Sequence, residues 1–292
     1  MKTVTVLMST YNGEHYLDEQ LDSIYHQEKL DDYTINLIIR DDGSSDNTLK
    51  IIESWKNKLN IQIIAGKNIG ARDSFFYLLE HAPKSDYYAF CDQDDIWYKD
   101  KLYRSINKLK EKGLYFSNIE YIGTDGKPIG TRLLSNDFQV DLKRILMCNP
   151  ANGCTMVWDQ QLHNYVNKIS NDTFTMHDEF MCTIACLFGE LQYDSLPTMG
   201  YRLHDTNVTQ SNNIIKRMKI RKNIWLGRKQ YSLDKRAKEL LRYDLRTGDR
   251  EILLSISQYK KGLNRLKLIK LFSCEEAGIS RSFKARMILG LL

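Results

Sequence analysis

The sequence of 292 residues has only four prolines, and none of its six cysteines belongs to a C-x-x-C pair. The missing pair argues against a zinc ribbon or a redox motif and favours reduced cysteines at small core positions. No run of about 18 apolar residues occurs, so we expect no transmembrane helix. The apolar stretch within residues 1–8 is too short for a signal peptide. These absences lead us to expect a cytoplasmic globular protein.

Two widespread nucleotide-binding motifs are also missing. The chain has neither the G-x-x-x-x-G-K phosphate loop nor the G-x-G-x-x-G turn of a dinucleotide site. Their absence argues against a nucleotide hydrolase and against an NAD-dependent enzyme.

Charge is distributed unevenly along the chain, whose formal net charge is +5. Residues 213–292 carry 21 Lys and Arg against 7 Asp and Glu, whereas residues 1–212 carry 21 against 30. We therefore expect an acidic domain over 1–212 and a basic helical region over 213–292.

Strand patterns alternate with helix patterns through the first hundred residues. Apolar spacing predicts strands at 3–8, 34–39, 61–64 and 87–91, and helices at 14–28, 46–59 and 71–80. Ser45 is a candidate N-cap for the second helix. Such alternation is typical of a doubly wound α/β fold with a mostly parallel sheet flanked by helices.

Polar clusters follow three of the predicted strands. They are Ser9–Gly13, Asp41-Asp42 and Asp92-Gln93-Asp94-Asp95. Ligands of open parallel sheets bind at the carboxyl ends of the strands, so we expect these clusters to share one edge. Three carboxylates within four residues favour a bound Mg²⁺ or Mn²⁺. The structural alternative is a solvated acidic loop in which Asp95 and Asp100 cap the following helix.

Four segments carry a resemblance to a known family. They are Val-Leu-Met-Ser-Thr-Tyr-Asn-Gly at 6–13, Arg-Asp-Asp-Gly-Ser-Ser-Asp at 40–46, Lys-Asn-Ile-Gly at 67–70 and Phe-Cys-Asp-Gln-Asp-Asp-Ile-Trp at 90–97. In order and approximate spacing they resemble glycosyltransferase family 2, whose members are inverting enzymes of the GT-A fold. The fourth segment resembles in particular the bacterial rhamnosyltransferase-like members, which build surface polysaccharides. The resemblance covers about residues 1–212. It implies a GT-A catalytic domain there, with a nucleotide-binding half over about 1–112 and an acceptor and catalytic half over about 113–212.

The resemblance implies roles for the residues of these motifs. Thr10 and Tyr11 would line the nucleobase pocket, and Asp42 would accept a hydrogen bond from the base. Asp92 and Asp94 match the D-x-D motif, with Asp94 as the direct metal ligand and Asp92 as a ligand of the metal, ribose or donor sugar.

Two further positions join this donor site. Asn68 belongs to the third motif, and Arg72 would face the diphosphate or, alternatively, lie on the surface.

Later segments supply the remaining candidates. Asp178 opens an apolar helix and matches the catalytic base of the family, with Glu179 as the alternative. Both acids would also suit the first turn of a helix for purely structural reasons. Tyr-Arg-Leu-His at 201–204 resembles a late family segment, in which Arg202 would pair with phosphate and His204 would bind metal or diphosphate.

The basic residues of 213–292 are interleaved with apolar ones, including Trp225. This pattern favours peripheral binding of the region to the anionic inner face of the cell membrane. The alternative is a helical region that packs on the acidic domain or on a second subunit. No nucleic-acid-binding motif accompanies the charge, and the sequence leaves the oligomeric state open.

We therefore predict an inverting, metal-dependent glycosyltransferase that uses a dTDP-rhamnose or UDP-hexose donor. Its acceptor would be a saccharide or a lipid-linked saccharide in surface polysaccharide biosynthesis. Two other hypotheses are a metal-dependent nucleotidyltransferase and an inactive scaffold with a basic tail. A nucleotidyltransferase normally has a basic, Gly-rich loop near its N-terminus, which Ser9–Gly13 does not provide.

Overall fold

The structure, a computed structural model, describes residues 1–132, 140–147, 149–204 and 232–258. Most of the predicted basic region, including Trp225 and the segment after 258, lies outside the described residues. Within these ranges, no helix combines the length and the apolar character that crossing a bilayer requires.

The first half of the chain alternates strands and helices as predicted. Its elements are β1 (Lys2–Thr10), α1 (Leu17–Tyr25), β2 (Tyr33–Asp41), α2 (Thr48–Trp55), β3 (Asn60–Ala65), α3 (Ala71–His81), β4 (Tyr87–Cys91), β5 (Ile96–Trp97) and α4 (Lys101–Lys108). The strands are longer than predicted or equal in length, and α1 and α2 are shorter. Ser45 as N-cap was wrong: Asn47 holds that position, and Asp46 Oδ1 accepts the Thr48 amide at 3.0 Å.

The second half adds shorter elements. They are β6 (Gly113–Ser117), β7 (Glu120–Ile122), β8 (Pro128–Arg132), α5 (Leu142–Met147), the 3₁₀ turn η1 (Gly153–Thr155), β9 (Val157–Asp159), α6 (Gln160–Val166), α7 (His177–Phe188), β10 (Glu190–Asp194), β11 (Met199–Arg202), α9 (Leu233–Leu240) and α10 (Thr247–Ser257).

Seven of these strands form one sheet in the order β10-β6-β9-β4-β1-β2-β3. All pairs are parallel except those of β9, which runs antiparallel between β4 and β6. The predicted mostly parallel sheet is therefore confirmed. A second sheet has the order β5-β11-β7-β8. Its strand β5 is the next strand after β4 in the chain, so the second sheet is joined to the first through the carboxyl end of β4.

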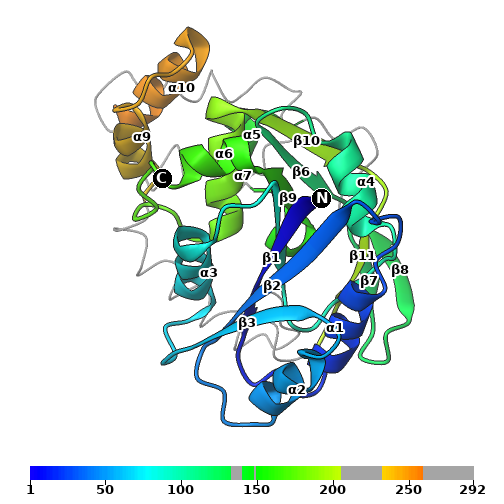
Figure 1. Cartoon of the computed structure of the whole chain (residues 1–292). Coiled ribbons are helices and arrows are strands. Elements are labelled where there is room, and N and C mark those ends of the chain that lie inside the picture. The colour runs from blue at the N-terminus through cyan, green and yellow to red at the C-terminus, as the bar shows by residue number, and fades with distance from the viewer. Residues whose placement is uncertain (133–139, 148, 205–231, 259–292) are drawn as a thin grey trace.

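Side chains alternate between two apolar layers, as the two-residue period of a strand requires. On β1, Val6 and Met8 pack into one layer and Leu7 into the other. On β4, Cys91 packs into the first of these layers and Phe90 into the second. Figure 1 shows α1, α2 and α4 over the first layer and α3, α6 and α7 over the second. Because helices cover both faces of the sheet, the ends of the strands remain as the place where a ligand can bind.

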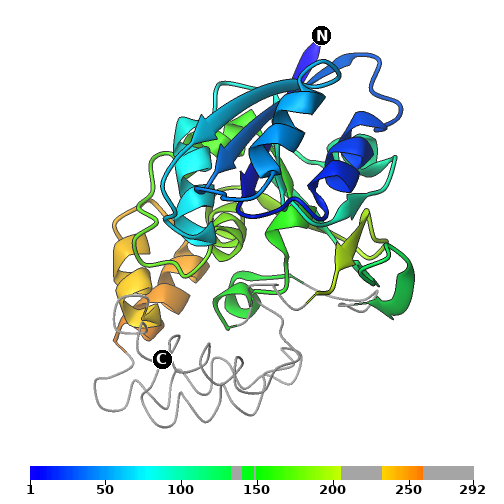
Figure 2. The same ribbon diagram turned by 90° about the horizontal axis from the view of Figure 1, so that it is seen from below.

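Helices α9 and α10 pack on the catalytic body. Leu233, Leu240, Leu253 and Ile256 are buried in the same layer as the side chains of α7. Burial of an aliphatic side chain stabilises by about 1.5–3 kcal/mol, so four of them hold this helical pair firmly. Figures 1 and 2 both place the pair, in yellow and orange, beside the green helices. For residues 232–258, packing on the body is the alternative that the structure supports.

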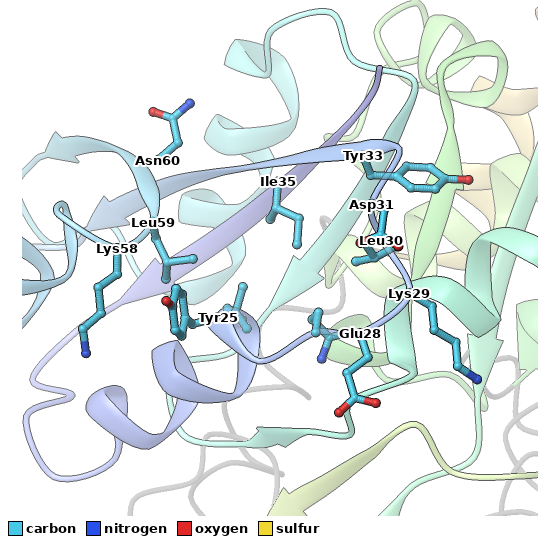
Figure 3. Close-up of a pocket in the computed structure, with 12 residues that line it drawn as sticks. Tyr25, Glu28, Lys29, Leu30, Asp31, Tyr33, Ile35, Lys58, Leu59 and Asn60 are labelled. Carbon is cyan, nitrogen blue, oxygen red and sulfur yellow. The ribbon is translucent and has the colours of Figure 1, made fainter.

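A pocket of about 450 Å³ lies between α1 and the strands β2 and β3. Figure 3 shows Tyr25, Leu30 and Tyr33 among its lining residues. Tyr33 and Asn60 are the first residues of β2 and β3. The pocket is therefore at the amino ends of these strands, opposite the edge where ligands of such sheets bind.

Candidate active site

The carboxyl ends of β1, β2 and β4 lie side by side. Thr10 pairs in register with Asp41, and Met8 pairs with Cys91, the last residue of β4. The loops that follow these three strands therefore leave the sheet at the same edge, as predicted from their polar residues.

The first two loops are tied to each other. The Asn12 amide donates to Ser44 Oγ and the Ser45 amide donates to Asn12 Oδ1, both at 2.9 Å. The Gly13 amide donates to Thr48 Oγ1 at 2.8 Å. Asn12 has a φ of 47°, which is a conformation that Asn adopts more readily than most residues. The two motifs thus form one rigid unit.

Gln93 links this unit to the acidic loop. Its Oε1 accepts the Tyr11 amide at 2.9 Å, and its Nε2 donates to the Tyr11 carbonyl at 3.1 Å. The Tyr11 ring remains 48% exposed, whereas the Thr10 hydroxyl is buried and donates to Asp41 Oδ1 at 3.2 Å. Gln93 was missed because nothing in its sequence position indicates a partner 82 residues away.

Asp42 has contacts that differ from the predicted ones. Its two oxygens accept the amides of Ile69 and Gly70, each at 2.8 Å, and Oδ1 also accepts Arg40 Nη1. The carboxylate is almost fully buried, so it orders the 67–70 loop rather than facing an open pocket. Asn68 is exposed in that same loop.

Asp94 and His204 come together as candidate metal ligands. His204 Nε2 lies 2.8 Å from Asp94 Oδ2, although 110 residues separate them in the chain. The His204 ring also lies against Tyr16, with 5.2 Å between ring centroids. Both members of the pair remain partly exposed.

Arg202 holds the backbone of the acidic loop. Its Nε donates to the Asp94 carbonyl at 2.8 Å and its Nη1 to the Thr124 carbonyl at 2.9 Å, while Nη2 pairs with Glu19. The guanidinium lies 4.5 Å from the Tyr16 ring centroid, and the side chain is fully buried. These contacts differ from the predicted one with phosphate. In this structure Arg202 positions Asp94.

Three groups that can bind a cation converge beneath the loop. The nearest ligand atoms of Asp92, Asp95 and Cys154 lie within 4.8 Å of one another. Burial and the neighbouring Asp94 raise the pKa of Asp92 to about 7 and that of Asp95 well above its usual range. The structural alternative had Asp95 as a helix cap, but its Oδ1 accepts the Arg202 amide at 3.0 Å.

A buried lysine partly balances these carboxylates. Lys101 is fully buried and donates to the Cys154 carbonyl at 2.9 Å. Burial lowers its pKa to about 8, and the charge of Asp95 opposes this effect. Sequence analysis did not identify this amine, because Lys101 begins an ordinary helical pattern.

The arrangement fits a divalent cation. Among the described residues, Asp95 Oδ2 is buried and accepts no hydrogen bond, which is costly without a positive partner. Cys154 is a poor competitor for Mg²⁺ or Mn²⁺, because burial raises its thiol pKa far above the usual range and keeps it protonated. Hard cations also prefer carboxylate oxygens over thiols.

The two candidate bases at the start of α7 have different contacts. Asp178 Oδ1 accepts the adjacent Glu179 amide at 2.6 Å, and the Asn149 side chain also hydrogen-bonds the Asp178 carboxylate. Burial raises the Asp178 pKa to about 7, and its charge in turn raises the pKa of Asp92. Glu179 instead accepts Thr175 Oγ1 at 2.6 Å and is held by Arg236. The geometry therefore favours Asp178.

Arg72 lies near the entry to α7. Its Nε donates to the Phe174 carbonyl at 3.0 Å and its Nη2 to the Asn171 carbonyl at 2.9 Å. Its guanidinium also lies over the Phe76 ring. The structure thus brings Arg72 to the loop before Asp178 rather than to the acidic loop.

Gly153 allows the start of α7 to approach η1. A Cβ at Gly153 would lie 2.3 Å from His177 Nε2, and the His177 ring is stacked on Phe75 with 3.9 Å between centroids. Because the ring cannot move away, we expect Gly153→Ala to lower the free energy of unfolding by about 1–3 kcal/mol. Urea unfolding measures this change.

Gly248→Ala is the matched control for that prediction. No atom lies within 4 Å of a Cβ at Gly248, which is in α10. This change is expected to be neutral or to stabilise by about 0.5–1 kcal/mol. Equal stability of the Gly153→Ala variant and the wild type would show that the His177 stack is not tight.

The fold and its edge of carboxylates define a transferase of the GT-A type. TarS residues 1–349 from Staphylococcus aureus, solved with UDP-GlcNAc, have this fold: TM-score 0.61, 19% identity, 94% of this chain and 77% of that one. The mannosyltransferase PcManGT of Pyrobaculum calidifontis, solved with GDP-Man and Mn²⁺, gives a TM-score of 0.53 at 16% identity, over 98% and 79% of the two chains.

The chain belongs to glycosyl transferase family 2, whose family model matches residues 5–159. It is 35% identical over 222 residues to the dTDP-rhamnosyl transferase RfbG of Shigella flexneri, covering 70% of this chain and 74% of that protein. The predicted family and fold are confirmed, and the chain is a nucleotide-sugar glycosyltransferase of polysaccharide biosynthesis. The nucleotidyltransferase hypothesis is set aside.

Proposed function

We propose that this enzyme transfers a hexose, with inversion, from a dTDP- or UDP-linked donor to a hydroxyl of a saccharide or lipid-linked saccharide. The similarity to a dTDP-rhamnosyl transferase supports dTDP-rhamnose as the first donor to test. A UDP-hexose is the alternative, since TarS was solved with UDP-GlcNAc. Peripheral membrane contact through 213–292 stays a prediction from the sequence.

The observation that carries the proposal is the proximity of Asp178 to the acidic loop. Asp178 comes from α7 and Asp92 from the end of β4. The ring centroid of His177, next to Asp178, lies 4.6 Å from that of Phe90, which precedes Asp92 by two residues. The charge of Asp178 adds a small contribution to the raised pKa of Asp92, after burial and Asp94. An acceptor hydroxyl beside Asp178 would thus lie next to a donor bound at Asp92 and Asp94. Asp178 would take the proton of the hydroxyl as its oxygen attacks the anomeric carbon.

A divalent cation completes the proposed donor site. Asp94, Asp92 and His204 would hold Mg²⁺ or Mn²⁺, and Asp95 adds an unpaired oxygen beneath them. The bound cation would supply a Lewis acid for the charge that develops on the diphosphate leaving group. Tyr11, with its exposed ring, is the residue proposed to contact the base.

The raised pKa of Asp178 predicts the pH dependence of transfer. Burial disfavours the charged carboxylate, so the group is protonated below about pH 7 and cannot act as a base there. We expect kcat to fall about tenfold per pH unit below 7 and to level off above it. Rates measured with saturating donor and metal from pH 5 to 9 test this. A flat profile through pH 7 would contradict the assignment of Asp178.

Thermal unfolding with nucleotides tests the proposal as a whole. Ligands that bind the native state raise the melting temperature. At a ligand concentration of 100 times Kd, they stabilise the folded state by about 2.7 kcal/mol. We expect dTDP or UDP compounds to raise the melting temperature only when Mn²⁺ or Mg²⁺ is present. The sugar nucleotide with the same base should then serve as the donor in a transfer assay. The same shift without metal would remove the cation from the proposal. No shift with any nucleotide would contradict the donor site.

A further inference from the structure

The loop that leads into α7 is clamped from both sides by arginines. Residues 167–176 connect α6 to α7, and Arg72 of α3 binds the carbonyls of Asn171 and Phe174 on one side. On the other side Arg236 of α9 donates to the Thr173 carbonyl through Nε at 3.2 Å and Nη2 at 3.1 Å. The position of the first turn of α7 therefore depends on two distant helices.

Arg236 also binds the residue next to the proposed base. Its Nη1 pairs with Glu179 Oε1 and its Nη2 with Glu179 Oε2, the latter at 3.2 Å. Its guanidinium lies 4.5 Å from the Phe174 ring centroid, and the side chain is only 3% exposed. A bidentate, buried pair of this kind fixes both distance and orientation.

The helical pair that carries Arg236 is itself anchored. Arg246 Nη2 donates to the Cys186 carbonyl of α7, and Tyr243 Oη donates to the Lys168 carbonyl at 3.3 Å. The Tyr243 ring meets Phe188, the last residue of α7, edge to face. Arg236 of α9 thus contacts the start of α7, and the connection between α9 and α10 contacts its end.

We propose that Arg236 is a positioning residue for Asp178 and that α9–α10 belong to the catalytic unit. Arg236 holds Glu179, whose amide binds Asp178 Oδ1, and thereby sets where the base meets the acceptor hydroxyl. This inference rests on the proposed function of Asp178. Because a displacement of about 1 Å can cost about 10²-fold in rate, a looser first turn of α7 slows transfer without weakening donor binding.

Kinetics of the full-length enzyme test this role. We expect Arg236→Gln to lower kcat by about 10- to 100-fold with the donor KM within about twofold. Arg236→Lys keeps the charge but not the bidentate geometry, so its kcat should lie between those of Arg236→Gln and the wild type. Arg242→Gln is the matched control, because Arg242 lies two residues after the end of α9 and its side chain is 73% exposed in a pair with Glu239. A kcat of folded Arg236→Gln within twofold of wild type would overturn the proposal.

Glu179→Gln provides a second route if Arg236→Gln fails to fold. It should lower kcat about tenfold, and the double variant should be no slower than the slower single variant, because both act through one contact. Additive losses would overturn the proposed coupling. A loss of kcat equal to that of Asp178→Asn would instead identify Glu179 as the base.

Hydrogen exchange separates this proposal from the proposed function. In Arg236→Gln the amides of Glu179 and Phe180 should exchange faster than in wild type, whereas Arg242→Gln should leave them unchanged. This readout needs no activity. If the wild type transfers no sugar but exchange rises as stated, the proposed function fails and the clamp stands. Unchanged exchange in Arg236→Gln would overturn the clamp.

Discussion

Replacement of Asp178 by Asn is expected to lower kcat by about 10³-fold while leaving nucleotide binding intact. Asn has the same shape and can still accept the Glu179 amide, which Asp178 Oδ1 binds at 2.6 Å. It cannot accept a proton from the acceptor hydroxyl. The measurements are kcat with saturating donor and the thermal shift with nucleotide and metal.

The pH profile of the same variant provides an internal check. Its remaining activity should no longer fall below pH 7, because the Asp178 carboxyl, whose pKa is about 7, has been removed. Asp92 has a similar pKa in the absence of metal, so the profile is measured with saturating metal, which would keep Asp92 charged. If Asp178→Asn keeps more than about a tenth of the wild-type rate, another group is the base.

Asp94→Asn should abolish transfer for a different reason. Loss of the carboxylate that pairs with His204 would weaken the cation site and remove several kcal/mol of leaving-group stabilisation, or about 10³-fold in rate. Unlike Asp178→Asn, it should also remove the metal-dependent part of the nucleotide thermal shift. Titration with Mn²⁺ at fixed nucleotide measures this loss.

Asp100→Asn is the control for the metal site. Asp100 follows the acidic loop as the N-cap residue of α4 and lies 3.7 Å from Arg104. Its replacement should leave both rate and metal response within about twofold, since exposed pairs contribute at most about 1 kcal/mol. A metal response in Asp94→Asn equal to that of wild type would exclude Asp94 as a ligand.

The sheet and the edge that carries the site were predictable from the sequence. The predicted strands 3–8, 34–39 and 87–91 alternate with helices, which indicates parallel pairing, and parallel strands bring their carboxyl ends together. The same reasoning placed the acidic loop at this edge before any contact was known. Local patterns sufficed because the strand period and the helix period are themselves local properties.

The partners of the charged residues were not predictable in this way. Arg202 meets the Asp94 carbonyl 108 residues away, and Arg72 meets the Phe174 carbonyl 102 residues away. Arg202 was expected to pair with phosphate, and Arg72 to face the diphosphate or lie on the surface, because a motif identifies the residue type and not its remote neighbours. For Asp42, the amides of Ile69 and Gly70 at the start of α3 occupy the oxygens expected to bind the base.

The antiparallel strand β9 has a consequence for how the protein is made. It enters the sheet between β4 and β6, although it follows β4 by more than 60 residues in the chain. As the polypeptide leaves the ribosome, β4 therefore has one unpaired edge until Val157–Asp159 have been synthesised. Unpaired edges recruit other strands, so the nascent chain is most prone to aggregation in this interval. A fragment that ends near residue 112 would carry the same open edge permanently.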